Sequence, residues 1–147
     1  MTEKKNGIIQ AYYNKLEKSY YECYKFNDKI EGEYKLYYSE TGQIKNICNY
    51  KNDKREWEYK VYYQNEQLHE ICNYKNDKRE GGYKLYYENG QLRVICNYKN
   101  NNLEGEYKEY SCDGELQKIH YYIDGKKEDE YIKYNKNTQS LKMCNIL

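Results

Sequence analysis

The chain contains no proline, one phenylalanine, one tryptophan and no long apolar run. Proline lacks the backbone N–H that a β-ladder uses, so its absence leaves the whole chain able to pair in sheets. No stretch reaches the ~18–20 apolar residues of a membrane-spanning helix, and the opening MTEKKNGIIQAYY has no apolar core of a secretory signal. We therefore expect a cytoplasmic, reducing location, in which the six cysteines remain thiols.

An excess of charge is also absent. The 25 basic and 24 acidic residues leave a formal net charge of +1, which argues against nucleic acid as a partner and leaves only weak attraction to an anionic membrane. Large aliphatic side chains are few, with 11 Ile, 9 Leu and 2 Val, whereas tyrosine occurs 23 times. Because tyrosine can bury its ring and keep its hydroxyl hydrated, this composition favours a thin sheet over a thick globular core.

One pattern recurs every 24 or 25 residues. Two columns of tyrosines and one column of cysteines and a histidine share this period: Tyr34, Tyr59, Tyr83, Tyr107 and Tyr131; Tyr37, Tyr62, Tyr86, Tyr110 and Tyr134; Cys23, Cys48, Cys72, Cys96, His120 and Cys144. Several columns with one period are typical of a repeat fold, in which a unit too small to be stable alone packs on its neighbours.

Each unit contains two turn signals. One lies at Thr41-Gly42 and its equivalents, of which Asn89-Gly90 is the clearest, and the other lies at Asn52-Asp53 and its equivalents. Such dipeptides between alternating runs predict β-hairpins. We predict an all-β fold: an elongated, twisted, single-layer antiparallel meander of about five to six stacked hairpin repeats of ~24 residues. Residues 1–147 form one domain, with a degenerate copy at 7–30, core repeats at 31–134 and a capping edge strand at 135–147.

The two turn signals also predict the pairing. With Asn89-Gly90 as a two-residue turn, Tyr87 faces Leu92 and Tyr83 faces Cys96; with the next turn at Asn100-Asn101, Cys96 faces Gly105. The cysteines and one tyrosine column then share a face, and the lysines share the other. The same pairing sets Cys72 opposite Gly81 and Cys48 opposite Trp57.

The cysteine column predicts neither a disulfide nor a metal site. Equivalent residues one hairpin apart lie ~9.6 Å apart, whereas a disulfide needs Cα atoms within ~7 Å and two zinc-bound thiolates lie closer still. Cys112, beside a turn, is the cysteine we expect to be exposed. His120 should face Asp129 as a cross-strand polar pair, because no nucleophile accompanies it. We therefore expect no cofactor and no enzymatic activity.

The fullest repeat carries a recognisable motif, Gly-x-Tyr-x-x-Tyr-Tyr-x-x-Gly-x-Leu, with a further Tyr and Gly: Gly81, Tyr83, Tyr86, Tyr87, Gly90, Leu92, Tyr98 and Gly105. This motif resembles the MORN-repeat variant over roughly residues 31–134. The resemblance implies an elongated single-layer sheet that serves as a protein-binding scaffold, a lipid-associating module near membranes, or a bacterial antitoxin or immunity protein. Trp57 and Asp129 depart from the motif by replacing its glycine.

A column of lysines lies on the second face: Lys35, Lys60, Lys84 and Lys108. Glutamates two residues earlier should neutralise it, so a solvated charge ladder is favoured over a binding site for phosphoinositide or nucleic acid. Gly82 interrupts the glutamate column, which leaves a local basic spot at Lys84 and Arg93.

The functional hypothesis that follows is a non-enzymatic scaffold for protein–protein interaction, with an antitoxin or immunity role as its sharper form. We predict a partner site around Trp57, with Tyr34, Tyr38, Tyr59 and Tyr63 beside it; the alternative is that Trp57 only fills the slot left by glycine elsewhere. Two other functions remain open: association with a lipid surface, and self-assembly into a homodimer through the apolar C-terminal segment SLKMCNIL.

Overall fold

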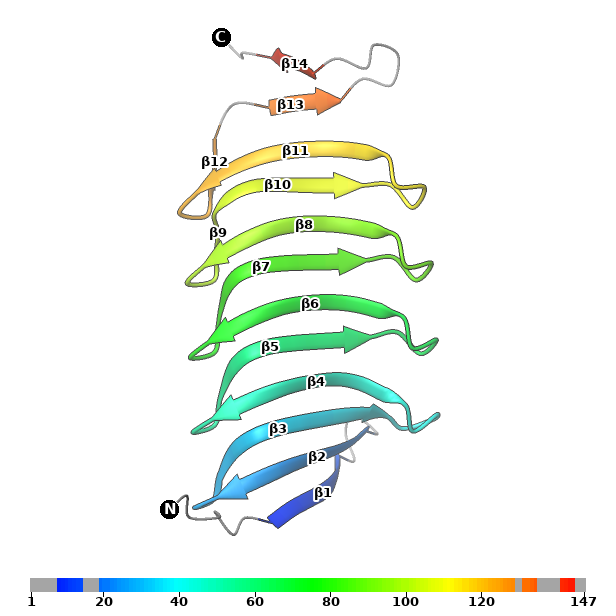
Figure 1. Cartoon of the computed structure of the whole chain (residues 1–147), viewed down its shortest axis with the longest axis vertical. Helices are drawn as coiled ribbons and strands as arrows, with labels where there is room; N and C mark the ends of the chain where they lie inside the picture. The colour runs from blue at the N-terminus through cyan, green and yellow to red at the C-terminus, as the bar shows by residue number, and fades with distance from the viewer. Residues whose placement is uncertain (1–7, 15–18, 129–130, 135–140, 145–147) are drawn as a thin grey trace, which may run out of the picture.

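The computed structural model of the chain describes residues 8–14, 19–128, 131–134 and 141–144. These residues form one open antiparallel sheet in which neighbouring strands follow chain order, apart from short strands beside β8 and β11 (Figure 1). The strands are β1 (Ile8–Asn14), β2 (Ser19–Phe26), β3 (Lys29–Tyr38), β4 (Ile44–Lys51), β5 (Lys54–Tyr62), β6 (Leu68–Lys75), β7 (Lys78–Tyr86), β8 (Leu92–Lys99), β9 (Asn102–Leu103), β10 (Gly105–Tyr110), β11 (Leu116–Ile123), β12 (Lys126–Lys127), β13 (Tyr131–Tyr134) and β14 (Leu141–Cys144). The predicted all-β meander of hairpins is confirmed.

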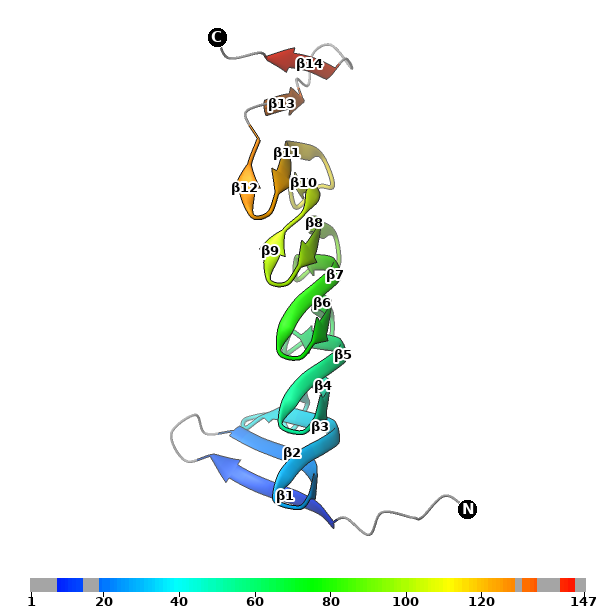
Figure 2. The same cartoon turned by 90° about the vertical axis from the view of Figure 1, so that its left-hand side faces the viewer.

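Turns of one kind line one long edge of the sheet. They lie at residues 27–28, 52–53, 76–77, 100–101 and 124–125, and both central residues of each have positive φ, as in Asn76 (50°) and Asp77 (65°). This is the type I′ geometry that suits two-residue hairpins, and Asn, Asp and Gly adopt it most readily. We call this edge the I′ edge. Figure 2, which looks onto it, shows the hairpins one above another along the long axis.

The turns at the opposite edge differ from the predicted two-residue form. The Tyr87 N–H donates to the Gln91 carbonyl at 2.8 Å, the Gly90 N–H donates to the Tyr87 carbonyl at 2.9 Å, and Gly90 has a φ of 82°. The loop therefore has three residues and ends in a left-handed one. The predicted pairing of Tyr87 with Leu92 is wrong, since Tyr86 faces Leu92. A bulge then restores the predicted pairing of Tyr83 with Cys96.

A second bulge occurs on the other side of each cysteine. Cys72 faces Tyr59 and Tyr83, one on each side, while Gly81 faces Tyr98. The predicted pairs of Cys72 with Gly81 and of Cys48 with Trp57 are therefore wrong, as is that of Cys96 with Gly105, which faces Tyr122. The cause is the left-handed backbone in the glycine column, with φ of 79° at Gly81, which puts extra residues into the ladder.

The two faces of the sheet differ in burial. We call them the cysteine face and the lysine face, after the columns that each carries. Cys23, Cys48, Cys72 and Cys96 are only 1–3 % exposed, because tyrosine rings lie over the cysteine face in pairs such as Tyr59–Tyr74 and Tyr83–Tyr98, with centroids 5.5 Å apart. Aromatic pairs of this kind contribute about 0.5–1.5 kcal/mol beyond the area they bury. Tyrosine thus replaces the second layer that most sheets need.

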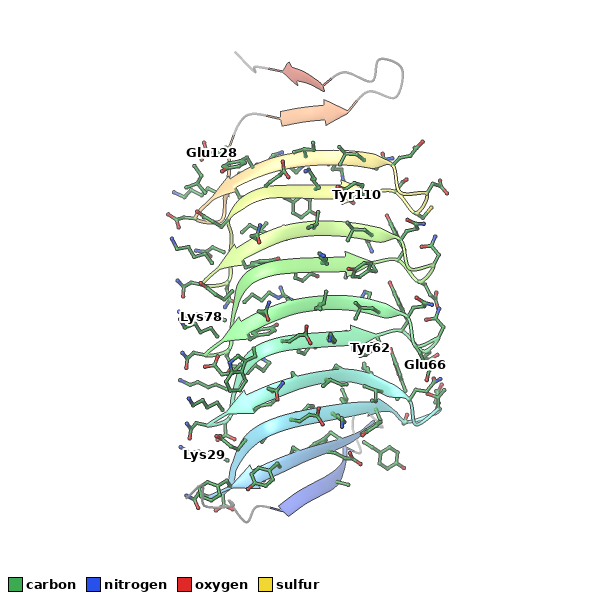
Figure 3. All side chains as sticks on the ribbon, in the orientation of Figure 1. Lys29, Tyr62, Glu66, Lys78, Tyr110 and Glu128 are labelled. Atoms are coloured by element: carbon green, nitrogen blue, oxygen red, sulfur yellow. The ribbon has the colours of Figure 1, made fainter. Side chains whose placement is uncertain are left out.

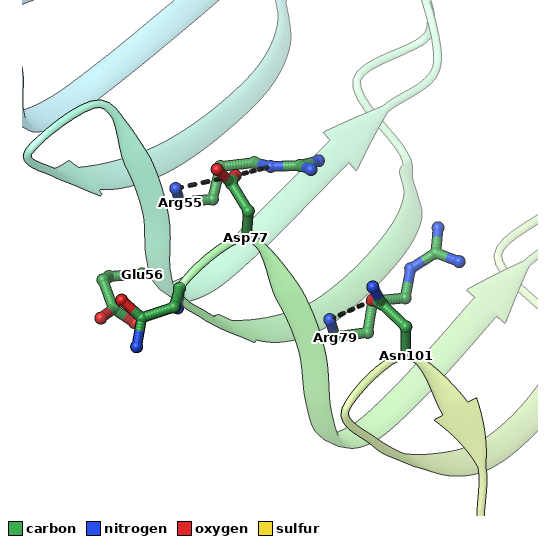
Figure 4. A network of polar contacts seen from close by, with 6 residues as sticks. Arg55, Glu56, Asp77, Arg79 and Asn101 are labelled. Carbon is green, nitrogen blue, oxygen red and sulfur yellow. Dashed lines mark hydrogen bonds and ion pairs between the residues drawn. The ribbon is translucent and has the colours of Figure 1, made fainter.

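Hydrogen bonds along the I′ edge join each turn to the preceding repeat. The Asp77 N–H donates to the Arg55 carbonyl, and the Arg55 N–H donates to Asp77 Oδ1, each at 3.0 Å. The Asn76 N–H donates to Glu56 Oε2 at 3.1 Å. Figure 4 shows the bonds from Arg55 to Asp77 and from Arg79 to Asn101 in successive repeats. Burial opposes ionisation of Asp77, but the hydrogen bonds from Arg55 outweigh it and lower the pKa of this carboxyl.

The opposite edge has its own ladder between repeats. The hydroxyls of Tyr38, Tyr63 and Tyr87 donate to the carbonyls of Tyr62, Tyr86 and Tyr110 at 2.7–2.9 Å. Both edges are therefore linked from repeat to repeat by side chains as well as by the sheet itself.

At the C-terminal end, β13 pairs with β14, and β14 is the last strand of the sheet. The remainder of the predicted edge segment 135–147, and the predicted partner of His120, Asp129, lie outside the described residues. Pairing of two copies at this edge stays a prediction. In the part of the chain that the structure describes, no helix is long and apolar enough to span a membrane.

We expect Asp77→Gly to lower the free energy of unfolding by about 1–2 kcal/mol, because it removes the acceptor of both the backbone N–H and the Nε–H of Arg55. Glycine tolerates the φ of 65° at this position, so backbone strain does not contribute. Asp77→Asn is the matched control, since Asn101 accepts the equivalent bond, and it should lose less than half as much. Urea denaturation measures both values; equal losses would contradict the role given to this bond.

We also expect Cys112 to react with a thiol reagent far faster than Cys23, Cys48, Cys72 and Cys96 in the folded chain. Cys112 is exposed and the other four are buried. The experiment uses a Cys144→Ser background, in which one thiol should react rapidly at pH 8 and the other four only after unfolding in urea. The further change Cys112→Ser should abolish the rapid phase, and a rapid phase that persists would contradict the burial of the column.

Alkaline pH should destabilise the fold. Burial raises the pKa of Cys48 and Cys96 to about 11 and that of Cys72 to about 12, from 9.0 in an exposed thiol. Because the folded chain retains these protons longer, their contribution is complete below about pH 9 and is lost as the pH rises through 11–12. Urea midpoints should fall between pH 8 and pH 10.5, and by less when Cys72 is replaced by serine or alanine. An unchanged midpoint would contradict the prediction.

Candidate functional site

Trp57 occupies a strained backbone position. Its φ is 64°, in the left-handed region, where the equivalent residues Gly32, Gly81 and Gly105 have φ of 78–80°. A residue with a Cβ pays roughly 1–2 kcal/mol for this conformation, whereas glycine adopts it without that penalty. The fold therefore prefers glycine here, and the second repeat carries tryptophan instead.

The indole of Trp57 lies largely in solvent. It is 57 % exposed, the highest value among the exposed large apolar residues of the described chain. A Cβ built on Gly32, Gly81 or Gly105 meets no atom within 4 Å. The backbone around these glycines therefore leaves room for a side chain without enclosing it. Whether Trp57 serves a partner or only fills space stays a prediction.

Trp57 lines an open groove of about 410 Å³ beside the I′ edge. The other lining residues come from β4 to β7 and belong mainly to the lysine face: Lys51, Glu56, Asn73, Tyr74, Lys75 and Glu80. Glu56 and Glu80 each accept a backbone N–H from a turn, at 3.1 and 2.8 Å. The lysines have no ion-pair partner within the described ranges. The groove therefore combines an indole with two available ammonium groups.

None of the four tyrosines predicted beside Trp57 lines the groove, although Tyr59 contacts Tyr74, which does. Tyr34 stacks on Tyr21 with centroids 5.4 Å apart, and Tyr59 meets the edge of Tyr74. Tyr38 and Tyr63 donate their hydroxyls to carbonyls near the opposite edge. The prediction lacked the bulge that changes the ladder partner of Trp57 from Cys48 to Tyr74. Lys51 and Lys75 were not identified as groove residues from the sequence. Their position directly before the type I′ turns is the sequence feature that could have identified them.

The lysine column is largely neutralised, as predicted. Ion pairs join Lys35 to Glu33, Lys60 to Glu58 and Lys108 to Glu106. Hydrogen bonding to these glutamates raises the pKa of each lysine.

The fourth lysine of the column, Lys84, has no such partner among the described residues, because Gly82 replaces the glutamate. The predicted basic spot at Lys84 and Arg93 stays a prediction. Lys84 faces Ile95, whereas the Arg93 guanidinium lies 5.5 Å from the centroid of the Tyr87 ring. Arg93 is the extra residue of the bulge between Leu92 and Val94. Its side chain makes a cation–π contact with Tyr87.

The remaining reactive side chains do not assemble into a catalytic set within the described residues. The His120 ring lies 6.0 Å from Tyr107 and 6.4 Å from Tyr122, and burial, with Lys127 and Lys118, lowers the pKa of this histidine. Across the described part of the chain, no three His, Cys, Asp or Glu residues are placed to bind a metal ion. The groove at Trp57 is the feature that combines an exposed aromatic side chain with lysines that have no ion pair in the described part of the chain.

Comparison with known proteins agrees with this geometry. No curated protein matches the chain significantly. The family described as MORN repeat variant matches at four consecutive segments, residues 30–52, 55–76, 79–100 and 103–124. Each segment begins at the strand that follows a type I′ turn and ends at or just before the next such turn, so the matched unit is the hairpin that the structure repeats. The four segments together cover more than half of the chain, and the protein belongs to the MORN repeat variant family.

Proposed function

We propose that this repeat scaffold is a non-enzymatic protein that binds a partner protein through the groove at Trp57. The observation that supports the proposal is the conjunction at Trp57 of backbone strain and exposure, with a φ of 64° and 57 % of the residue in solvent. Strained residues persist where the surrounding structure compensates for them, and they concentrate at functional sites. Tryptophan is also among the residues most enriched at the energetic centres of protein interfaces.

The scaffold around the groove is suited to this task. Hydrogen bonds join successive repeats at both edges, so the strands that carry Trp57 and its neighbours are fixed before a partner arrives. A rigid binding surface loses little conformational entropy on association, and more of the contact energy then appears as affinity. The pairing of Lys60 with Glu58 next to the groove also suppresses non-specific attraction to anions.

Within this function, we propose an antitoxin or immunity role in the cytoplasm as the sharper form. It is supported by the membership of the MORN repeat variant family and by fold-level analogy alone. A toxin captured by the purified chain, whose activity is inhibited in a Trp57-dependent manner, is the expected partner. Association with lipid is the competing outcome, and sedimentation with anionic vesicles over a salt series distinguishes it.

The test separates binding from folding by using two substitutions of Trp57. Both Trp57→Gly and Trp57→Ala should weaken binding of the partner recovered from the native host at least tenfold, which corresponds to about 1.4 kcal/mol. Trp57→Gly should be at least as stable as the natural chain, because glycine relieves the strain, and more stable than Trp57→Ala by about 1 kcal/mol.

Calorimetric titration and urea denaturation measure the two effects on the same preparations. Because Trp57 is the one tryptophan of the chain, its fluorescence should also shift to shorter wavelength when a partner covers the indole. A partner that binds Trp57→Gly as tightly as the natural chain would refute the proposal. Loss of stability in Trp57→Gly would instead support a structural role.

A further inference from the structure

Like charges face each other across two hairpins of the I′ edge. Lys51 pairs with Lys54, and Lys75 pairs with Lys78, at the last ladder positions before each turn. All four side chains are exposed, and Lys51 and Lys75 line the groove of Trp57. Residues directly opposite in a ladder project from the same face, and like charges in such positions destabilise a sheet. The strain at Trp57 and this repulsion thus coincide in one place.

The nearby carboxylates do not offset these lysines by direct ion pairs. Each acidic side chain of the edge between residues 31 and 104 accepts a backbone N–H or pairs with a basic residue outside this group: Glu31, Glu33, Asp53, Glu56, Glu58, Asp77, Glu80 and Glu104. No ion pair within the described residues involves Lys51, Lys54, Lys75 or Lys78. Lys54 interacts electrostatically with Asp77, but all four lysines are exposed and available to a partner.

At both ends of the array, the last ladder position before the type I′ turn is occupied by an apolar residue. Phe26 pairs with Lys29 and is 37 % exposed, and Ile123 pairs with Lys126 and is 49 % exposed. Figure 3 shows Lys29 and Lys78 along this edge, with Glu66 at the opposite one. Between Phe26 and Ile123 the row of last positions reads Lys51, Lys75 and Lys99, with Trp57 beside it. A partner lying along the edge would meet apolar contacts at both ends and at Trp57, which lies between Lys51 and Lys75, and cations along the rest of the row.

We infer that the edge binds an extended, acidic segment of the partner protein, with Asp or Glu side chains at the two lysine pairs and an apolar residue against Trp57. This inference rests on the proposed function and specifies the chemistry of the partner. Successive repeats lie ~9.6 Å apart, so the row from Phe26 to Ile123 spans roughly 38 Å. About twelve residues of extended chain cover that length. The ligand's carboxylates relieve the repulsion within each lysine pair, which makes binding sensitive to salt.

A library of random twelve-residue peptides displayed on phage tests the inference. Peptides are selected on the natural chain after removal of those that bind Trp57→Gly. The selected peptides should carry more Asp and Glu than the unselected library, around at least one large apolar residue. Their affinity should fall at least tenfold in the double variant Lys51→Glu, Lys75→Glu, and should fall with rising salt. Peptides that depend on Trp57 but show no acidic excess would overturn the inference, as would a library that yields no Trp57-dependent peptide.

A matched control accompanies the double variant. Lys45→Glu changes one exposed lysine near the opposite edge, where Lys45 lies 5.8 Å from the Tyr38 ring, and its binding should stay within twofold of the natural chain. The double variant should not lose stability, since each change turns a like-charge pair into a Lys–Glu pair. A tenfold loss in the double variant with an unchanged urea midpoint supports the inference, and unchanged affinity overturns it. The partner recovered from the host is tested with the same variants, so the proposed function can stand while the charge inference fails.

Discussion

The fold depends on the hydrogen bonds that attach each type I′ turn to the preceding repeat. A single hairpin is marginal in water, and within the described residues no second layer covers this sheet. The turns at 52–53, 76–77 and 100–101 therefore contribute three bonds each. At 76–77 these are two between Asp77 and the backbone of Arg55, and one from Asn76 to Glu56. At the fourth repeat Gly125 retains the backbone bond to Leu103 but has no side chain to complete the set. The array thus loses one of its fixing interactions towards its C-terminal end.

These bonds also explain why the same residues recur in each repeat. The glutamate three residues after one turn accepts a backbone N–H from the next turn along the chain, and the Asn-Asp of a turn bonds to the repeat before it. Each copy must carry both halves, because it acts as donor on one side and acceptor on the other. The tyrosines also act within and between repeats. Rings such as Tyr59 and Tyr74 pack together on the cysteine face, and the Tyr63 hydroxyl donates to the carbonyl of Tyr86 in the next repeat. The interface between neighbouring repeats therefore accounts for both the amino-acid composition and the repeat period of the chain.

Much of this architecture could be predicted from the sequence, because contacts that recur leave columns. The period, the turn positions, the division into two faces and the pairing of Tyr83 with Cys96 follow from alternation between recognisable turns. The bulges could not be predicted in the same way. An extra residue in a ladder changes no spacing between equivalent positions, so the register beyond it shifts without altering the period. The glycine column was the available signal, since its repeated use at one ladder position is typical of left-handed backbone.

The bulge at Trp57 determines which residue Trp57 faces, and so which role its side chain can have. Placed opposite Cys48, Trp57 would have met tyrosines and a small buried thiol, and a filling role would have been reasonable. Opposite Tyr74, with a left-handed backbone and an open groove, it contributes strain and exposed apolar surface. The lysine pairs on either side add repulsion at the same repeats. A rigid array can sustain such local costs because its stability is spread over many repeat contacts, and their coincidence at one groove is what selection for binding, rather than for folding, would leave.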